Sequence, residues 1–206
     1  MSVGQTVSEY ERLYERVGEL ANGKLGNGLP GPAEMRDLAV RWLDAWNKHD
    51  VDGILACTTE DIVMADPTAL GLVARGRDEF RTFCGDFINS FPDIHFEIPH
   101  APYVGVEEAR IAVQWRMSGT FTREFAAPAS SVPLAPTGRS FAIDGIDLYE
   151  LRDGRVCSWL LYYDAYTLSE QLGLAPPLDG RLMRMLAPAQ RVGAALMRRK
   201  ARRRTS

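Results

Sequence analysis

Two aspartates lie in sequence surroundings that suit acid–base chemistry. Asp66 ends the apolar run DIVMAD directly before Pro67, and Asp147 lies inside the alternating run FAIDGIDLYEL. Alternation places Asp147 on the same strand face as Ile143 and Tyr149. A carboxyl among apolar groups loses hydration, which raises its pKa and can keep it protonated. One ionised and one protonated carboxyl can serve as the base and the hydrogen-bond donor for proton removal beside a carbonyl group.

Aromatic residues that could form the walls of a binding pocket occur throughout the central part of the chain. The candidate wall residues are Trp42, Phe80, Phe83, Trp115, Trp159 and Tyr163. Pockets with aromatic walls and few polar groups bind flat, largely hydrophobic molecules. We therefore expect a hydrophobic small-molecule substrate.

Each carboxyl also has a purely structural interpretation. Asp-Pro is a common way to begin a turn, so Asp66 could simply cap one. Asp147 could be a surface residue of its strand, although its phase with Ile143 favours burial. Asp164 precedes the helical segment AYTLSEQLG and is expected to cap it.

The sequence lacks the common metal- and cofactor-binding patterns. His49, His95 and His100 share no metal-ligand spacing. The three cysteines lie far apart within apolar segments, which predicts neither a disulfide framework nor a zinc site. There is no phosphate-cradling glycine loop, nucleophile elbow or dinucleotide fingerprint. We expect no metal and no cofactor.

The apolar pattern predicts helices first and strands afterwards. Helical spacing runs from Ala33 to Trp46, and the segment HDVDGILAC begins a second helix with Asp50 or Asp52 as its N-cap. The short strand DIVMADP follows, and a third helix is predicted over 77–89.

The next part of the chain has the alternation and the aromatic and β-branched content of strands. The predicted strands are HFEIPHAPYV, ARIAVQWRMSGTFTREF, RSFAIDGIDLYEL and VCSWLLYYD, the last two joined by the turn RDGR. Helices followed by long strands with short connections imply an antiparallel sheet with helices on one face. The segment AAPASSVPLAPT fits neither period and is predicted to be a loop and a candidate lid.

The two ends differ from this central part. Apolar residues at helical spacing over 8–21 predict an amphipathic helix before a glycine- and proline-rich linker, so residues 1–32 are expected to be an appended segment. Residues 176–206 form a basic tail with an apolar stripe at helical spacing. After Asp179 the chain has nine basic residues and no acid, so residues 1–180 carry a net charge of −12 against −3 for the whole chain.

This charge distribution restricts the expected partners. A body this acidic repels polyphosphates, so no nucleic-acid binding is expected of it. The basic tail could make weak contact with a membrane surface or a partner protein. The sequence starts without a signal-peptide pattern and has no long apolar run, which predicts a cytoplasmic protein.

Several ordered segments resemble a known superfamily. The stretch HDVDGILACTTEDIVMADP followed by RGRDEF is similar to the first part of ketosteroid isomerases. Downstream, GTFT, PTGR, GIDLYELRDGRV and LLYYDAYTLSEQLGL resemble SnoaL-like polyketide cyclases, which share the NTF2-like fold. The resemblance covers roughly residues 34–175. It implies an α+β domain over 33–175, in which a cone-shaped, curled antiparallel (mixed) sheet and three N-terminal helices enclose a pocket.

The resemblance also implies roles for individual residues. Asp66 falls on the family's general base and Asp147 on its protonated oxyanion-hole acid. The oxyanion-hole tyrosine of ketosteroid isomerases falls on Trp42, which offers only an indole N–H. Tyr163 corresponds to the ring that closes the pocket near the end of the last strand.

Two other mechanisms found in the superfamily lack their signatures here. Limonene-epoxide-hydrolase-like enzymes have a carboxylate at the position of Leu161. The His-Trp-Asp run of many SnoaL-like cyclases is replaced by Ser158, Trp159 and Leu160. Neither mechanism is therefore carried over to this chain.

Two principal hypotheses follow from the sequence. The first is an isomerase- or cyclase-type enzyme that performs cofactor-independent proton transfer, isomerisation or aldol-type cyclisation, on a hydrophobic carbonyl compound such as a polyketide or steroid-like substrate. The second is a non-catalytic NTF2-like module for ligand binding or dimerisation. The resemblance implies a homodimer in both cases. A third hypothesis is a membrane-associated protein that uses its basic C-terminal helix.

Overall fold

The computed structural model describes residues 32–68, 71–105, 109–126 and 133–180, together with the isolated positions 188, 197 and 198. The helix predicted over 8–21 lies outside the described residues, as does most of the basic tail. Within the described part, no helix combines the length and apolar character needed to cross a membrane.

The three helices predicted ahead of the strands are present. They are α2 (Pro32–Asn47), α3 (Val51–Ala56) and α4 (Gly76–Ser90). Asp50 caps α3, because its carboxylate accepts a 2.9 Å hydrogen bond from the Gly53 backbone N–H. A further helix, α5 (Ala165–Gln171), follows the last strand, and its predicted cap Asp164 accepts from the backbone N–H groups of Tyr166 and Thr167.

Seven strands form one mixed sheet in the described part. They are β1 (Thr58–Asp66), β2 (Leu72–Arg75), β3 (His95–Glu97), β4 (Tyr103–Val104), β5 (Arg110–Thr120), β6 (Ser140–Arg152) and β7 (Arg155–Tyr163). The strand order is β2-β1-β7-β6-β5-β3, with β4 also paired to β5. The β1–β7 pair is parallel and the other pairs are antiparallel. The α+β class and the mixed sheet agree with the prediction.

The strands differ from the sequence prediction by more than one residue in four places. Strand β1 begins at Thr58, three residues before the predicted run DIVMADP. The segment 95–104 forms two short strands, because Pro99 and Pro102 between them have no N–H to donate to a ladder. Strand β5 ends at Thr120 rather than continuing to Phe125, which makes only an isolated bridge with Leu134. The four-residue strand β2 was not predicted.

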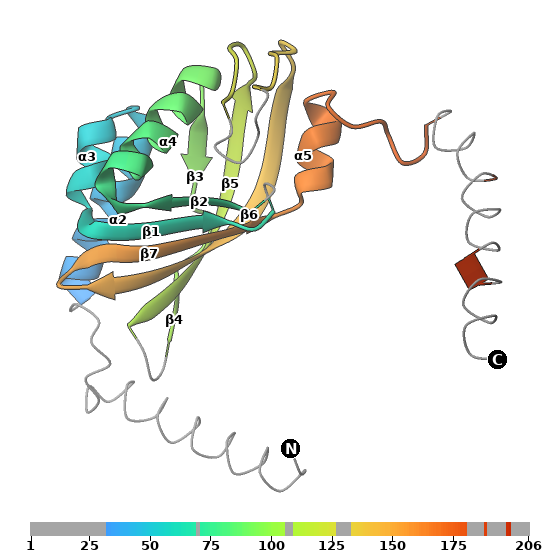
Figure 1. Ribbon diagram of the computed structural model, residues 1–206. Helices are drawn as coiled ribbons and strands as arrows, with labels where there is room; N and C mark the ends of the chain where they lie inside the picture. Colours follow the sequence, from blue (N-terminus) through green and yellow to red (C-terminus); the bar gives the residue numbers. More distant parts are fainter. Residues whose placement is uncertain are drawn as a thin grey trace, which may run out of the picture.

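The sheet curls around the helices, which cover one of its faces (Figure 1). Helices α2, α3 and α4 lie over the β1, β2 and β7 side, and α5 lies at the opposite end of the sheet (Figure 1). Two hydrophobic clusters fill the concave side, one beneath α2–α4 and one extending to Leu172 just after α5.

Helix α5 is fastened to an unpaired edge of β6. Strand β7 pairs with β6 only from Gly145 onward, so the backbone of Ala142 has no partner on that side. The Gln171 amide fills this place, since its Oε1 accepts from Ala142 N at 2.8 Å and its Nε2 donates to Ala142 O at 3.1 Å. This contact holds the inner face of α5 over the open end of the sheet.

Candidate functional site

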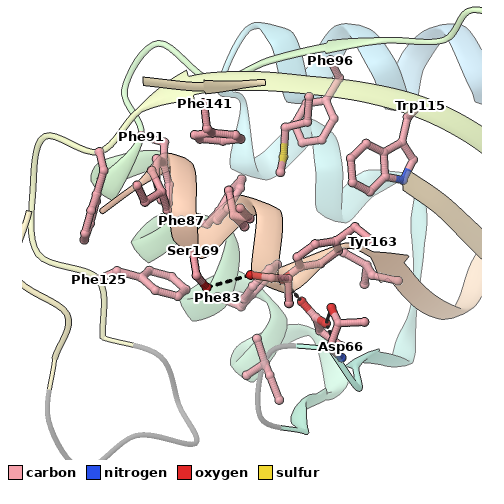
Figure 2. A pocket seen from close by; sticks show the side chains of 18 of the residues that line it. Asp66, Phe83, Phe87, Phe91, Phe96, Trp115, Phe125, Phe141, Tyr163 and Ser169 are labelled. Atoms are coloured by element: carbon pink, nitrogen blue, oxygen red, sulfur yellow. Dashed lines mark hydrogen bonds between the residues drawn. The ribbon is translucent and has the colours of Figure 1, made fainter. Parts of the chain in front are cut away.

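A cavity of ≈ 370 Å³ lies between the concave face of the sheet, α4 and α5. Its volume is in the range of small-molecule sites, about 300–1,000 Å³. Figure 2 shows the aromatic rings that surround the cavity, together with Ser169 of α5, which also lines it. The labelled rings are Phe83, Phe87, Phe91, Phe96, Trp115, Phe125, Phe141 and Tyr163.

Asp66 faces this cavity from the end of β1 and is only 5% exposed. Its Oδ1 accepts hydrogen bonds from the Thr68 backbone N–H at 2.9 Å and the Thr68 hydroxyl at 2.6 Å. Its Oδ2 accepts from the Tyr163 hydroxyl at 2.8 Å (Figure 2). Asp66 therefore does both things considered from the sequence: it caps the turn after β1, and it presents a carboxyl to the cavity.

The Tyr163 hydroxyl keeps its proton in this arrangement. Burial raises the pKa of Tyr163, and the nearby charge of Asp66 raises it further. The phenol is consequently a hydrogen-bond donor to Asp66 over the physiological pH range.

Asp147 faces the same cavity from the middle of β6 and is 4% exposed. Its Oδ2 accepts a 2.6 Å hydrogen bond from the Tyr149 hydroxyl. The Tyr149 oxygen in turn accepts from the Trp42 indole N–H at 3.2 Å. The burial of Asp147 and its position in the cavity lining exclude its interpretation as a surface strand residue.

The environment of Asp147 brings its protonation equilibrium close to neutral pH. Burial raises the pKa of Asp147 to about 7, opposed by the hydrogen bond from Tyr149 and by the Trp115 and Trp159 indoles. The negative charge of Asp66 acts in the same direction as burial. Both the neutral and the ionised form of Asp147 are therefore accessible near pH 7.

Six of the eight residues selected from the sequence line the cavity. They are Asp66, Phe83, Trp115, Asp147, Trp159 and Tyr163. The expectation for the other two needs correction. Trp42 lies behind Asp147, where its N–H supports Tyr149, and Phe80 is fully buried with its ring edge-on to Trp159 at 5.8 Å. Both belong to the core beneath the helices.

The sequence analysis missed several residues of the site. Tyr149 had a detectable signal, because it lies two positions from Asp147 on the same strand face. Phe87 and Phe91 follow Phe83 at intervals of four, which places all three rings on one side of α4 and its C-cap. Thr68 had only the weak signal of a hydroxyl two residues after an Asp-Pro pair.

The described part of the chain contains no group of three histidine, cysteine, aspartate or glutamate side chains placed to hold a metal ion. The polar atoms around the cavity come from carboxyl, hydroxyl and indole groups. Such groups can exchange a proton with a bound molecule and donate hydrogen bonds to it.

The fold defines a class of protein, the NTF2-like superfamily with its ketosteroid-isomerase-like fold. Within this superfamily, the SnoaL-like domain matches residues 39–159, more than half of the chain. The chain belongs to the SnoaL-like family. No curated protein matches the sequence.

Solved structures confirm this fold. AclR from Streptomyces galilaeus, a proposed hydroxylase, is 22% identical, with a TM-score of 0.57 over 82% of this chain and 98% of AclR. A proposed SnoaL-like polyketide cyclase from Jannaschia sp. CCS1 is 18% identical, with a TM-score of 0.58 over 72% of this chain and 98% of that one. A proposed polyketide cyclase from Xanthomonas campestris pv. campestris is 19% identical, with a TM-score of 0.54 over 69% and 96%.

Proposed function

We propose that this chain is a SnoaL-like enzyme that catalyses cofactor-independent proton transfer on a hydrophobic carbonyl compound. The reaction is an isomerisation or an aldol-type cyclisation, and the substrate is polyketide-like or steroid-like. One observation supports this most strongly: Asp66 and Asp147 are both buried, both line one apolar cavity, and differ in their hydrogen-bond partners. Polar groups that converge in an apolar cavity are typical of small-molecule sites.

The two carboxyls have complementary tasks in this proposal. The Asp66 carboxylate removes a proton from the carbon beside the substrate carbonyl. The electron pair of that C–H bond forms a C=C bond, and the π pair of the C=O bond moves to the oxygen. Asp147 in its neutral form donates a hydrogen bond to this oxygen as its negative charge develops. Thr68 and Tyr163 hold the Asp66 carboxylate in a fixed orientation.

The proton balance closes in both variants of the reaction. In an isomerisation, Asp66 returns the proton to a different carbon. In a cyclisation, the enolate carbon forms a bond to a second carbonyl carbon of the same molecule, and the resulting alkoxide takes the proton from Asp66. Neither variant requires an oxidant or a reductant.

Similarity to solved structures supports the substrate class only at the level of the family. Two of the similar structures are described as proposed polyketide cyclases. Polyketide chains carry several carbonyl groups with acidic C–H bonds between them, which is the chemistry that a buried carboxylate base and a buried donor can promote. The predominantly aromatic walls suit the flat ring systems that such chains form.

Replacement of Asp66 tests this function. With a panel of enones and polyketide-like β-diketones, Asp66→Asn should reduce kcat/KM by about 10²-fold or more, because the amide cannot accept the proton. Asp144→Asn is the matched control, since Asp144 lies on β6 but is exposed and paired with Arg116. Equal turnover by wild type and Asp66→Asn would remove Asp66 from the chemistry.

A non-catalytic binding module is the second candidate. Three donors from Thr68 and Tyr163 already occupy Asp66, and Trp42 stands where ketosteroid isomerases have a tyrosine. Tight binding of a carbonyl compound, unchanged in Asp66→Asn and without turnover of any panel member, would favour this candidate.

A further inference from the structure

Three buried polar atoms around the cavity have no hydrogen-bond partner in the part of the chain that the structure describes. They are Nε1 of Trp115, Nε1 of Trp159 and Oδ1 of Asp147. All three residues line the cavity and are at most 4% exposed. Buried polar groups without a partner are uncommon in folded proteins, so each one calls for an explanation.

The sheet register brings these atoms together. Asp147 is paired with Val113 on β5 and with Leu161 on β7. Trp115 and Trp159 lie two residues away from those partners, one on each neighbouring strand, so they share the face of Asp147. Aromatic side chains can reach across such diagonal positions. Both indoles are close enough to Asp147 to lower its pKa, although neither makes a hydrogen bond of good geometry to it.

The hydrogen-bonding capacity of these groups defines the missing partner. An indole N–H can only donate. Oδ2 of Asp147 already accepts from Tyr149, so a neutral Asp147 presents its proton on Oδ1. Three donors then converge on one region of an otherwise apolar wall. The partner that these donors lack is an acceptor oxygen, and a carbonyl oxygen with its two lone pairs can accept from more than one of them at the same time.

We propose that Trp115 and Trp159 are ligand-binding residues whose indole N–H groups, together with Asp147, form a three-donor site for one carbonyl oxygen. This inference rests on the proposed function for the class of ligand, and it goes further by assigning the atoms that hold the carbonyl. The ligand is a flat ketone whose oxygen is buried against the sheet. Hydrocarbons and protonated amines cannot satisfy the site, because they offer these donors no lone pair.

Neighbouring residues hold each indole in place. The Trp159 ring is enclosed by aromatic rings from both layers, at 5.5 Å from Trp42, 5.6 Å from Trp46 and 6.0 Å from Tyr149. The Trp115 ring lies over Gly145, its cross-strand partner. A Cβ at Gly145 would lie 2.2 Å from Cζ2 of Trp115, so glycine at this position is what allows the ring to lie against the strand.

Two probes of the same shape separate oxygen recognition from hydrophobic burial. The first is 2-acetylnaphthalene, a flat ketone, and the second is 2-isopropenylnaphthalene, in which a CH₂ group replaces the oxygen. Wild-type protein at pH 6 should bind the ketone at least tenfold more tightly than the alkene in calorimetry or fluorescence titration. A wild type without this preference, including one that binds neither probe, overturns the inference.

Ring-preserving variants then test each indole. Trp115→Phe and Trp159→Phe should each weaken ketone binding about fivefold to thirtyfold and change alkene binding less than threefold, because only the donor is lost. The control Trp46→Phe alters the cavity wall without removing a donor from Asp147, and should change both affinities equally. Equal losses for both probes in Trp115→Phe and Trp159→Phe would overturn the inference.

A measurement on the wild type remains valid if a variant fails to fold. The chain has four tryptophans, so four indole ¹H–¹⁵N resonances are expected. The ketone should shift the Trp115 and Trp159 indole protons downfield relative to the alkene and leave Trp42, bonded to Tyr149, unchanged. Absence of that difference contradicts the site. If oxygen recognition is present while Asp66→Asn retains turnover, only the proposed catalytic role of Asp66 fails.

Discussion

Tyr149 donates a 2.6 Å hydrogen bond to Asp147 from two residues further along the same strand, and its own oxygen accepts from Trp42. Because the Trp42 N–H can only donate, it directs the Tyr149 proton towards the carboxyl. The resemblance to ketosteroid isomerases implies that their oxyanion-hole tyrosine falls on Trp42. In this structure a different phenol, Tyr149 on β6, donates to the acid.

Removal of this phenol should change the acidity of Asp147. Tyr149→Phe deletes a donor that stabilises the ionised carboxyl, so the pKa of Asp147 should rise above its wild-type value of about 7. The variant also leaves the Trp42 N–H unpaired, which should lower the free energy of unfolding by about 1–3 kcal/mol. Carboxyl ¹³C NMR titration measures the first effect and urea unfolding the second.

The control for this variant is Tyr162→Phe on β7. Tyr162 is 45% exposed and lies next to Tyr163 on the opposite face of the sheet, away from the cavity. Its replacement should leave the titration of Asp147 unchanged. If the pKa of Asp147 in Tyr149→Phe equals the wild-type pKa, the phenol does not act on the carboxyl.

Within the described residues, local sequence patterns predicted the helices and three of the four long strands, because these elements have a clear apolar period and, for two of the helices, a capping residue. The alternation in FAIDGIDLYEL correctly indicated a buried Asp147, and Asp50 and Asp164 cap their helices as expected. The sequence gives no comparable local signal for β2, whose four residues are stabilised by pairing with β1 after the chain has folded back.

The prediction of which aromatic residues line the cavity was less accurate, because it depended on residue type alone. Trp42 is partly buried and Phe80 fully buried, yet both pack in the core beneath the helices instead of lining the cavity. The ring stack on α4 was missed beyond Phe83, since which stripe of a helix faces a cavity depends on how the helix docks. The convergence of Trp115 and Trp159 on Asp147 required the register of three strands.

We propose that a second copy of the chain covers the outer face of β6 and β7. Ile146 and Tyr162 form a cross-strand pair on this face and are each 45% exposed, and Leu148 beside them is 40% exposed. The charged residues on either side are already paired within the chain, as in Arg116–Asp144 and Arg110–Glu150. An apolar strip between neutralised charges suits a self-complementary contact between two identical copies.

Light scattering after size-exclusion chromatography tests this contact. Wild type should have the mass of a dimer, about twice 22.9 kDa. Leu148→Glu should shift it towards the monomer, because two added charges would meet across the symmetric contact. Val40→Glu is the control, since Val40 is 61% exposed on α2. A monomeric wild type, or a Leu148→Glu variant that remains dimeric, would contradict the proposal.

The last prediction concerns stability and follows from the raised pKa of Asp147. Below its ordinary pKa of 3.8, Asp147 is protonated in both the folded and the unfolded chain. Between pH 3.8 and about 7 the folded chain keeps this proton while the unfolded chain has lost it. The contribution of Asp147 to the free energy of unfolding of the wild type therefore declines as pH rises. Asp147→Asn carries no such proton and can still accept from Tyr149. Its free energy of unfolding relative to wild type should therefore increase by roughly 1 kcal/mol per pH unit from pH 4 to 7 and then level off. Urea unfolding at pH 5, 6, 7 and 8 measures this difference.

The control variant Asp144→Asn should show no such increase, because the hydrogen bond from Arg116 lowers the pKa of Asp144 and places its titration below this range. If the difference between Asp147→Asn and wild type stays constant from pH 5 to 8, Asp147 is ionised in the folded protein throughout, and the neutral donor on which the mechanism depends is absent.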